Sequence, residues 1–159
     1  MQGKTVAESA VVMRHTPMPN ETNIAGSMHG GDLLKHIDNA GGMAAWRHAR
    51  NPVVTVSLEQ MSFLAPINLG QLLSLKASVH RVGHTSIDVG VRVETEDLNT
   101  GAVRHVASCY LTYVAVDAAG RPVAVPPLII SNAEDERRLM RAQERHYYRQ
   151  SLQKATEEN

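Results

Sequence analysis

Hydrophobic and polar positions alternate with a period of two along much of the chain after residue 52. Four segments show this pattern: residues 53–63, 72–82, 86–97 and 104–117. In the first of them the alternation places Val54, Val56 and Leu58 on one face, and the last is apolar on nearly both faces, which is typical of a central strand. Short loops rich in Gly, Asn and Asp separate the segments. The pattern therefore predicts an antiparallel meander of long strands.

The pattern is different before residue 52. Residues 5–16 predict one further strand, and a loop rich in Pro, Asn and Gly follows it. From Gly31 to Ala49 the apolar positions recur at helical spacing, so we expect one long helix. That helix is rich in Ala and Gly, which lowers its helix propensity and implies that something packs closely against it. One helix and about five strands predict an α+β fold, in which a curved antiparallel sheet wraps around a long central α-helix.

The last part of the chain differs in composition. Residues 131–159 are highly charged and carry few apolar side chains, and Ser131 with Glu134 resembles a helix capping box. We therefore expect one domain over residues 1–130 and a charged, solvated helical tail over residues 131–159.

Composition and charge exclude several classes of protein. Apolar residues make up 43% of the chain, and sixteen basic residues balance sixteen acidic ones. A formal net charge of zero gives no reason to expect a nucleic-acid or membrane partner. The single cysteine, Cys109, cannot form an internal disulfide, and no apolar stretch is long enough to span a bilayer. These features predict a cytoplasmic protein.

Asp38 stands out because it lies in the middle of the apolar helix. A buried carboxylate is costly unless it is paired or used, so Asp38 is either a satisfied structural acid or part of the chemistry. Other catalytic patterns are missing from the sequence. The eight histidines form no metal-ligand motif such as HExxH, no G-x-S-x-G turn is present, and Cys109 lies in an apolar strand. We therefore expect no metal site and no serine or cysteine nucleophile.

Four blocks of sequence resemble the hotdog-fold acyl-CoA thioesterases, in the bacterial acyl-CoA hydrolase branch. The blocks are NIAGSMHGGDLLKHID, VTVSLEQMSFLAPINLGQLL, RVGHTSIDV and TYVAVDAAGRPVAVP. They occur in the family's order, and the resemblance covers roughly residues 10 to 127. It implies the hotdog fold, a sheet wrapped around one long helix. It also implies hydrolysis of acyl-CoA to fatty acid and CoA without a separate cofactor, because CoA is part of the substrate.

The resemblance also assigns catalytic roles. It puts the catalytic carboxylate on Asp38, which would activate a water as general base or act as a direct nucleophile. The oxyanion donor falls on the amide of Gly30, with Gly31 close behind, at a helix start where N–H groups are unpaired. Asn23 matches the residue that positions the water or the substrate carbonyl, and His29 lies next to the site.

Binding of CoA is implied for the turn VGHTS and for a basic residue near the end of the domain. The turn would offer backbone and hydroxyl donors through Gly83, Thr85 and Ser86, with His84 between them as a further candidate. Many relatives carry Arg at the position of His84, and a neutral imidazole binds phosphate less well than a guanidinium. Either Arg81 substitutes for it or phosphate is held more loosely. Arg121 matches a basic position that could also reach the CoA phosphates.

Helix geometry adds a constraint on the assembly. Eight residues of α-helix rise about 12 Å, so Asp38 cannot act on the carbonyl that Gly30 of its own helix polarises. We therefore expect a site shared between two chains of a homodimer, and the resemblance implies an assembly of three such dimers. Two other hypotheses within the same fold are a non-catalytic acyl-CoA sensor and a dehydratase with a catalytic His.

Overall fold

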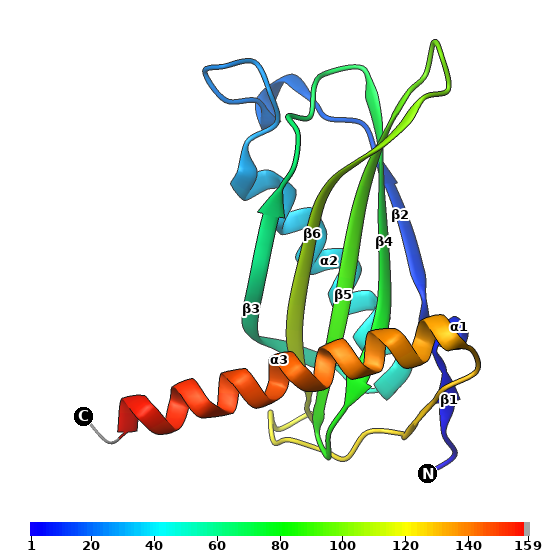
Figure 1. Ribbon diagram of the computed structural model, residues 1–159, viewed down its shortest axis with the longest axis vertical. Helices are drawn as coiled ribbons and strands as arrows, with labels where there is room; N and C mark the ends of the chain where they lie inside the picture. Colours follow the sequence, from blue (N-terminus) through cyan, green and yellow to red (C-terminus); the bar gives the residue numbers. More distant parts are fainter. Residues whose placement is uncertain (158–159) are drawn as a thin grey trace.

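The computed structural model describes residues 1–157 and shows a five-stranded antiparallel sheet curved around helix α2, Gly30–Ala49 (Figure 1). The strands are β2 (Val11–His15), β3 (Val53–Phe63), β4 (Gln71–Val82), β5 (Ser86–Asp97) and β6 (Val103–Ala115). This arrangement confirms the α+β hotdog architecture. It also confirms that the apolar segment over residues 104–117 is an inner strand, since β6 lies between β5 and β3.

Shorter elements complete the chain. They are β1 (Lys4–Thr5), α1 (Val6–Ser9), η1 (Pro19–Glu21), β7 (Leu128–Ile129) and the long C-terminal helix α3 (Ala133–Glu157). Strand β1 pairs with β7 in parallel, so the two ends of the domain lie together. None of the helices within residues 1–157 is both long and apolar enough to cross a membrane.

The prediction of one strand over residues 5–16 is only half right. Thr5 caps a short helix: its hydroxyl accepts from the backbone N–H of Glu8, and the Glu8 carboxylate accepts from the N–H of Thr5. The strand β2 begins only at Val11. The Ser/Thr-x-x-Glu signature of this capping box is present in the sequence, and it outweighs the strand propensity of the neighbouring valine.

The prediction of a simple meander is wrong for β3. Strands β4, β5 and β6 follow one another as hairpins, but the sheet order is β2-β4-β5-β6-β3. Residues 64–70 therefore connect edge strand β3 to β4, which lies beyond the central strand β5. Because the sheet curls around the helix on its concave face, a short connection can join two strands that are not neighbours in the sheet.

The apolar face of β3 points away from the core, although an alternating pattern usually places its apolar side chains inward. Val54, Val56 and Leu58 are 46%, 54% and 40% exposed, whereas Thr55 lies on the side of helix α2. The pairing of β3 with β6 shifts register after Thr55 and again after Glu59. These bulges and the edge position leave a row of apolar side chains uncovered in the single chain.

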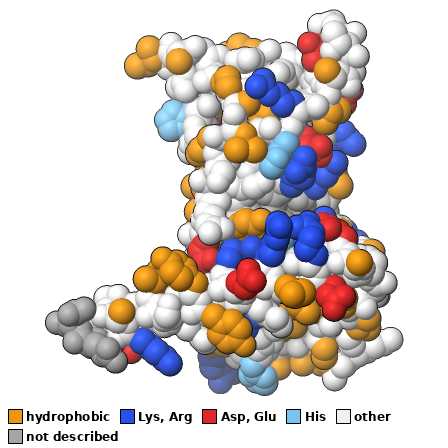
Figure 2. Space-filling model, in the orientation of Figure 1, with side chains coloured by type: hydrophobic (Ala, Val, Ile, Leu, Met, Phe, Trp, Pro, Cys, Tyr) orange, Lys and Arg blue, Asp and Glu red, His pale blue; other side chains and the backbone are white. Residues whose placement is uncertain are grey.

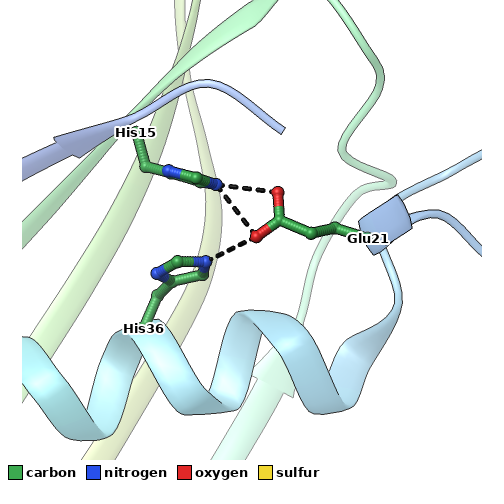
Figure 3. A group of neighbouring side chains, drawn as sticks. All are labelled: His15, Glu21 and His36. Atoms are coloured by element: carbon green, nitrogen blue, oxygen red, sulfur yellow. Dashed lines mark hydrogen bonds and ion pairs between the residues drawn. The ribbon is translucent and has the colours of Figure 1, made fainter. Parts of the chain in front are cut away.

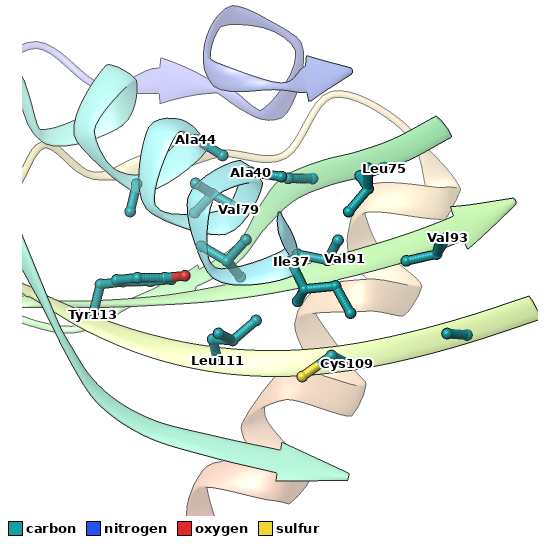
Figure 4. Packing of buried hydrophobic residues seen from close by; sticks show 14 of the residues in the cluster. Ile37, Ala40, Ala44, Leu75, Val79, Val91, Val93, Cys109, Leu111 and Tyr113 are labelled. Atoms are coloured by element: carbon teal, nitrogen blue, oxygen red, sulfur yellow. The ribbon is translucent and has the colours of Figure 1, made fainter. Parts of the chain in front are cut away.

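Helix α2 packs closely on the sheet through small side chains (Figure 4). Ile37, Ala40 and Ala44 are completely buried. A β-carbon at Gly41 would lie 2.6 Å from the Tyr113 hydroxyl, so only glycine fits there. This confirms the close packing that the Ala- and Gly-rich sequence implies. At the other end of the helix, Lys4 Nζ donates to the carbonyl of His48 at 2.7 Å.

Helix α3 crosses the outer face of the sheet (Figure 1), and basic side chains gather where it crosses (Figure 2). Its N-terminal cap is Asn132 with Asp135, one residue later than the expected Ser131 and Glu134, because the N–H of Asp135 donates to Asn132 Oδ1 at 2.9 Å. The Arg145 guanidinium lies 3.6 Å from the centre of the Tyr110 ring. The C-terminal segment is therefore packed on the domain along part of its length. Residues 158 and 159 of the expected tail lie outside the described residues.

Candidate active site

The Asp38 carboxylate is held by two hydroxyl groups. Thr55 Oγ1 of β3 and the Tyr113 hydroxyl of β6 each donate to Asp38 Oδ1 at 2.9 Å, and the Tyr113 hydroxyl lies 3.1 Å from the Asp38 carbonyl. Among the described residues, no donor contacts Oδ2. The carboxylate is thus fixed through one oxygen, and the other is available to accept a proton.

The neighbours of Asp38 are protonated groups. Burial, followed by the charge of Asp38, raises the pKa of the Tyr113 hydroxyl well above its usual value. Burial also raises the pKa of Cys109 to about 11, with a smaller contribution from Asp38. Both groups therefore remain neutral at physiological pH. Cys109 is a buried core thiol, consistent with its prediction as a core residue and not a nucleophile.

The start of helix α2 presents one open amide. His29 is the N-cap residue, and its Nδ1 accepts from the N–H of Gly31 at 3.0 Å. Within the described chain nothing accepts from the N–H of Gly30. The Phe63 ring lies against Gly30, where a β-carbon would come within 3.2 Å of it. The two glycines thus differ: the Gly31 amide is occupied by the cap, and the Gly30 amide is free to bind an anion.

Asn23 is exposed and bonded within its own loop. Its side chain pairs with Ser27, whose N–H donates to Asn23 Oδ1 at 3.3 Å, and its backbone N–H donates to the Ser27 carbonyl at 2.8 Å. No hydrogen bond joins Asn23 to Asp38 in the part of the chain that the structure describes. The loop therefore presents Asn23 outward and does not bring it to the carboxylate of the same chain.

Residues 83–86, which are expected to bind CoA, lie at the turn between β4 and β5. This turn is at the end of the molecule opposite to the start of helix α2 (Figure 1). The N–H of Gly83 donates to the Ser86 carbonyl at 2.9 Å, which closes the turn. The carbonyls of His84 and Thr85 accept from the N–H groups of Val125 and Ala115, so the turn is tied to the end of the domain.

The two arginines have different surroundings. Arg81 donates to Asp88 at 2.9 Å, and this ion pair lies mostly buried on the face covered by α3. Arg121 is 79% exposed and pairs with Asp117, four residues before it, at 3.0 Å. The commitment of Arg81 to Asp88 favours looser phosphate binding over the substitution of Arg81 for the family arginine.

Sequence reasoning missed Thr55 and Tyr113. Nothing in the alternation of residues 53–63 distinguishes Thr55 from any other polar strand residue. Tyr113 carried a usable signal, because a Tyr in an apolar inner strand needs a hydrogen-bond partner, and Asp38 is the acid on the helix that this strand faces. Sequence spacing also failed to show that His15, Glu21 and His36 lie together, away from Asp38.

Comparisons with known proteins identify relatives of this chain in sequence and in structure. The thioesterase superfamily matches residues 25–102. An uncharacterized acyl-CoA thioester hydrolase of Bacillus subtilis, YkhA, is 37% identical over 128 residues, which cover 80% of this chain and 74% of that protein. The crystal structure of an apo-hexameric acyl-CoA thioesterase has a TM-score of 0.92 at 32% identity, covering 96% of this chain and 97% of the other.

The acyl-CoA hydrolase of Staphylococcus aureus, solved with butyryl coenzyme A, coenzyme A and coenzyme A disulfide, is similar as well. Its TM-score is 0.90 at 30% identity, with 98% of this chain and 94% of that chain covered. Three alanine variants of the same enzyme, at an Asn, an Asp and a Thr, match with TM-scores of 0.93, 0.92 and 0.90. The fold, the length covered and the identity agree, and the chain belongs to the hotdog-fold thioesterase superfamily, in the branch of the bacterial acyl-CoA thioester hydrolases.

Proposed function

We propose that this enzyme hydrolyses acyl-CoA thioesters to free fatty acid and CoA, with Asp38 as the general base. The observation that carries the proposal is the Asp38 carboxylate, whose Oδ1 is fixed by Thr55 and Tyr113 while Oδ2 has no described partner. A base must be oriented and must also keep a lone pair free for the proton that it takes. Asp38 meets both conditions.

The reaction then follows in two steps. Asp38 Oδ2 takes a proton from a water as its oxygen attacks the thioester carbonyl, and the oxyanion that forms accepts from the Gly30 amide. The intermediate collapses with breakage of the C–S bond, and the proton passes to the CoA sulfur. The products are a carboxylic acid and a thiol, and no outside oxidant or reductant is needed.

The variants of the S. aureus enzyme support the choice of residues. The Asn, Asp and Thr replaced there are separated by 15 and 17 residues. Asn23, Asp38 and Thr55 have the same residue types at the same separations. We therefore propose that Thr55 belongs to the catalytic machinery together with Asn23 and Asp38.

We further propose that each site is shared between two chains. Helix α2 has 20 residues, about 30 Å, and separates the Gly30 end from the turn at Gly83. Val54, Val56 and Leu58 on edge strand β3 are exposed, as are Met43 and Trp46 on α2. An antiparallel partner would cover these side chains and bring the Gly30 end of one chain toward the Gly83 turn of the other.

The substrate and the larger assembly follow as proposals from the same comparison. The similar hexameric thioesterase and the S. aureus hydrolase with butyryl coenzyme A support an acyl-CoA substrate and an assembly of three dimers. We place the Gly83–Ser86 turn and the exposed Arg121 against the nucleotide part of CoA. A free, buried Cys109 suits a cytoplasmic enzyme.

The first test is thiol release from acyl-CoAs of increasing chain length by wild type, Asp38→Asn and Asp32→Asn. Asp32 is a partly exposed residue in the first turn of the same helix and serves as the matched control. We expect Asp38→Asn to lose about 10²- to 10⁴-fold in kcat and Asp32→Asn to keep the wild-type rate. A folded Asp38→Asn protein with full activity would contradict the proposal.

A second test addresses the shared site. Asn23→Ala and Asp38→Asn proteins, each inactive alone, are unfolded together and refolded as a mixture. If Asn23 and Asp38 of one site come from different chains, half of the dimers carry one intact site, and about a quarter of the wild-type activity returns. If both residues come from one chain, every site carries a lesion and no activity returns.

A further inference from the structure

Three side chains that bind metals well converge outside the proposed catalytic site (Figure 3). His15 ends strand β2, Glu21 ends η1, and His36 lies in the second turn of α2. His15 Nε2 is 2.8 and 3.0 Å from the two Glu21 oxygens, and His36 Nε2 is 2.8 Å from Glu21 Oε1. The candidate ligand atoms all lie within 4.8 Å of one another.

The cluster is organised before any ion arrives. The side chains of His15, Glu21 and His36 are only 26%, 14% and 18% exposed, and the two imidazole rings lie 4.1 Å apart between centres with their planes tilted by 32°. The backbone N–H of Met18 donates to Glu21 Oε2 at 2.7 Å and orients the carboxylate. A ligand held by such an outer hydrogen bond loses less freedom when it binds a metal.

The cluster offers one carboxylate and two imidazole nitrogens as ligand atoms. A carboxylate together with neutral imidazoles is a ligand set that suits a divalent transition metal.

The distances require little change for an ion to enter. Two ligands 2.0–2.1 Å from a tetrahedral metal are about 3.3 Å apart, only a few tenths of an ångström more than the present His–Glu separations. The two imidazole nitrogens lie within 4.8 Å of each other. Each imidazole must then carry its proton on Nδ1 and bind through Nε2. Without the ion, each Nε2 carries the proton that it donates to Glu21, and the ion takes the place of that proton. No described residue hydrogen-bonds either Nδ1. Three protein ligands leave a fourth position open to water.

We propose that His15, Glu21 and His36 bind one divalent transition-metal ion per chain, of the class represented by Zn²⁺. Two imidazoles and one carboxylate favour Zn²⁺, Co²⁺ or Fe²⁺ over Ca²⁺ and Mg²⁺, which prefer all-oxygen sites. The ion lies apart from the catalytic base, because residues two apart on a helix, His36 and Asp38, point about 200° away from each other.

The position of the ion gives it a structural role. Glu21 precedes Asn23 by two residues, and its carbonyl accepts from the N–H of His29, the cap of helix α2, at 2.6 Å. A bound ion would fasten strand β2 and the loop over residues 16–29 to α2. The loop that presents Asn23 and the open amide of Gly30 would then be held in place by the metal.

The test is a titration of chelator-treated protein with Zn²⁺ by calorimetry, and with Co²⁺ by visible absorption. Wild type is expected to bind one ion per chain, with Co²⁺ bands typical of low coordination number. His15→Gln and His36→Gln should each weaken binding by more than the roughly 10- to 100-fold that loss of an outer-shell partner costs. The matched control is His105→Gln, a histidine on β6 whose ring hydrogen-bonds Ala107 and Ser108 and lies outside the cluster.

Two outcomes would overturn the proposal: wild type that stays folded and binds neither ion, or cluster variants that bind as tightly as wild type. Glutamine keeps an N–H donor for Glu21, so folding should survive, and thermal unfolding checks it. The ion should raise the Tm of wild type and of His105→Gln only. If a cluster variant does not fold, ¹⁵N spectra of wild-type histidines decide, because Zn²⁺ must shift the signals of exactly two rings.

Discussion

The Tyr113 hydroxyl has a double role at the centre of the molecule. It occupies the space opposite Gly41, and it donates to Asp38 Oδ1 at 2.9 Å. The same group therefore sets the distance between helix and sheet and the orientation of the proposed base. Thr55, the register partner of Tyr113 on the neighbouring strand β3, donates to the same oxygen, so the carboxylate has little freedom to rotate.

Replacing Tyr113 by Phe should separate these roles. The ring continues to fill the core, but a hydrogen bond to a charged group is lost, and we expect stability to fall by about 1.5–3 kcal/mol. The turnover number should fall while KM changes little, because Asp38 loses orientation and the substrate loses no contact. Urea unfolding and steady-state thiol release measure the two effects.

Tyr110→Phe is the matched control for that variant. Tyr110 lies on the same strand but on the outer face, under Arg145, and none of the described residues hydrogen-bonds its hydroxyl. The Tyr110→Phe variant should leave kcat and stability nearly unchanged. Equal effects of the two variants would mean that the Tyr113 hydroxyl does not orient Asp38.

Helix α2 shows how an element can be weak by propensity and still be the centre of a fold. Its glycines reduce intrinsic helix stability, yet Gly41 allows a contact with β6 that no other residue permits. Its ends are fixed by other parts of the chain, with His29 capping the start and Lys4 bonding the last carbonyls. Tertiary contacts thus supply what the helix sequence lacks.

Replacing either of two neighbouring glycines on α2 by alanine should change stability in opposite directions. An alanine at Gly41 would place its β-carbon 2.6 Å from the Tyr113 hydroxyl and should destabilise the protein by about 1–3 kcal/mol. An alanine at Gly42 would lie 3.7 Å from the Tyr113 ring, an ordinary contact, and should stabilise the helix by up to about 1 kcal/mol. Thermal unfolding of the two variants tests the helix–sheet distance. Similar Tm shifts would show that this contact is looser than described.

The C-terminus of α2 offers a stabilising change. Arg50 is the C-cap residue in the left-handed conformation, with φ of 56°, and its N–H donates to the Trp46 carbonyl at 2.7 Å. Arg50→Gly keeps that hydrogen bond and removes the β-carbon strain, so we expect a gain of about 1 kcal/mol in unfolding free energy. Arg50→Ala, which keeps the β-carbon, is the control and should show no such gain.

For the whole molecule, acid stability depends on a buried histidine. His80 lies beneath α3, and burial, then Arg138 and Arg145, lower its pKa to about 3 from 6.5. Between these values the unfolded chain binds a proton at His80 that the folded chain does not bind. Stability should therefore fall as the pH drops from 6.5 toward 3, by at most about 1.4 kcal/mol per pH unit.

Comparison of wild type with His80→Asn isolates this contribution. The variant should show a shallower loss of stability over the same interval when urea unfolding is followed at several pH values. Glu21 acts at lower pH: its folded pKa of about 2 lies below the usual 4.5, so its stabilisation is lost between those values. Parallel pH curves for wild type and His80→Asn would contradict the assignment to His80.

The sequence predicts the helices and strands of this protein better than their order in the sheet or the contacts between distant residues. The period of two and the helical run set the elements, and helix α2 begins within one residue of expectation. Sheet order is not local: the place of β3 beside β6 follows from curvature around α2, which no spacing within residues 53–70 reveals. The Asp38–Thr55–Tyr113 contact and the His15–Glu21–His36 cluster join distant segments, so only the fold shows them.

The pairing of β3 with β6 has a consequence for synthesis. β3 ends at Phe63, and β6 begins at Val103, so 39 residues separate the two partners. At ordinary translation rates the ribosome needs about 2–8 s to make that interval. Strand β3, with its apolar Val54, Val56 and Leu58, therefore emerges from the ribosome that much earlier than the strand that will pair with it. The nascent chain is then most exposed to association with other chains, and early chaperone binding should centre on residues 53–63.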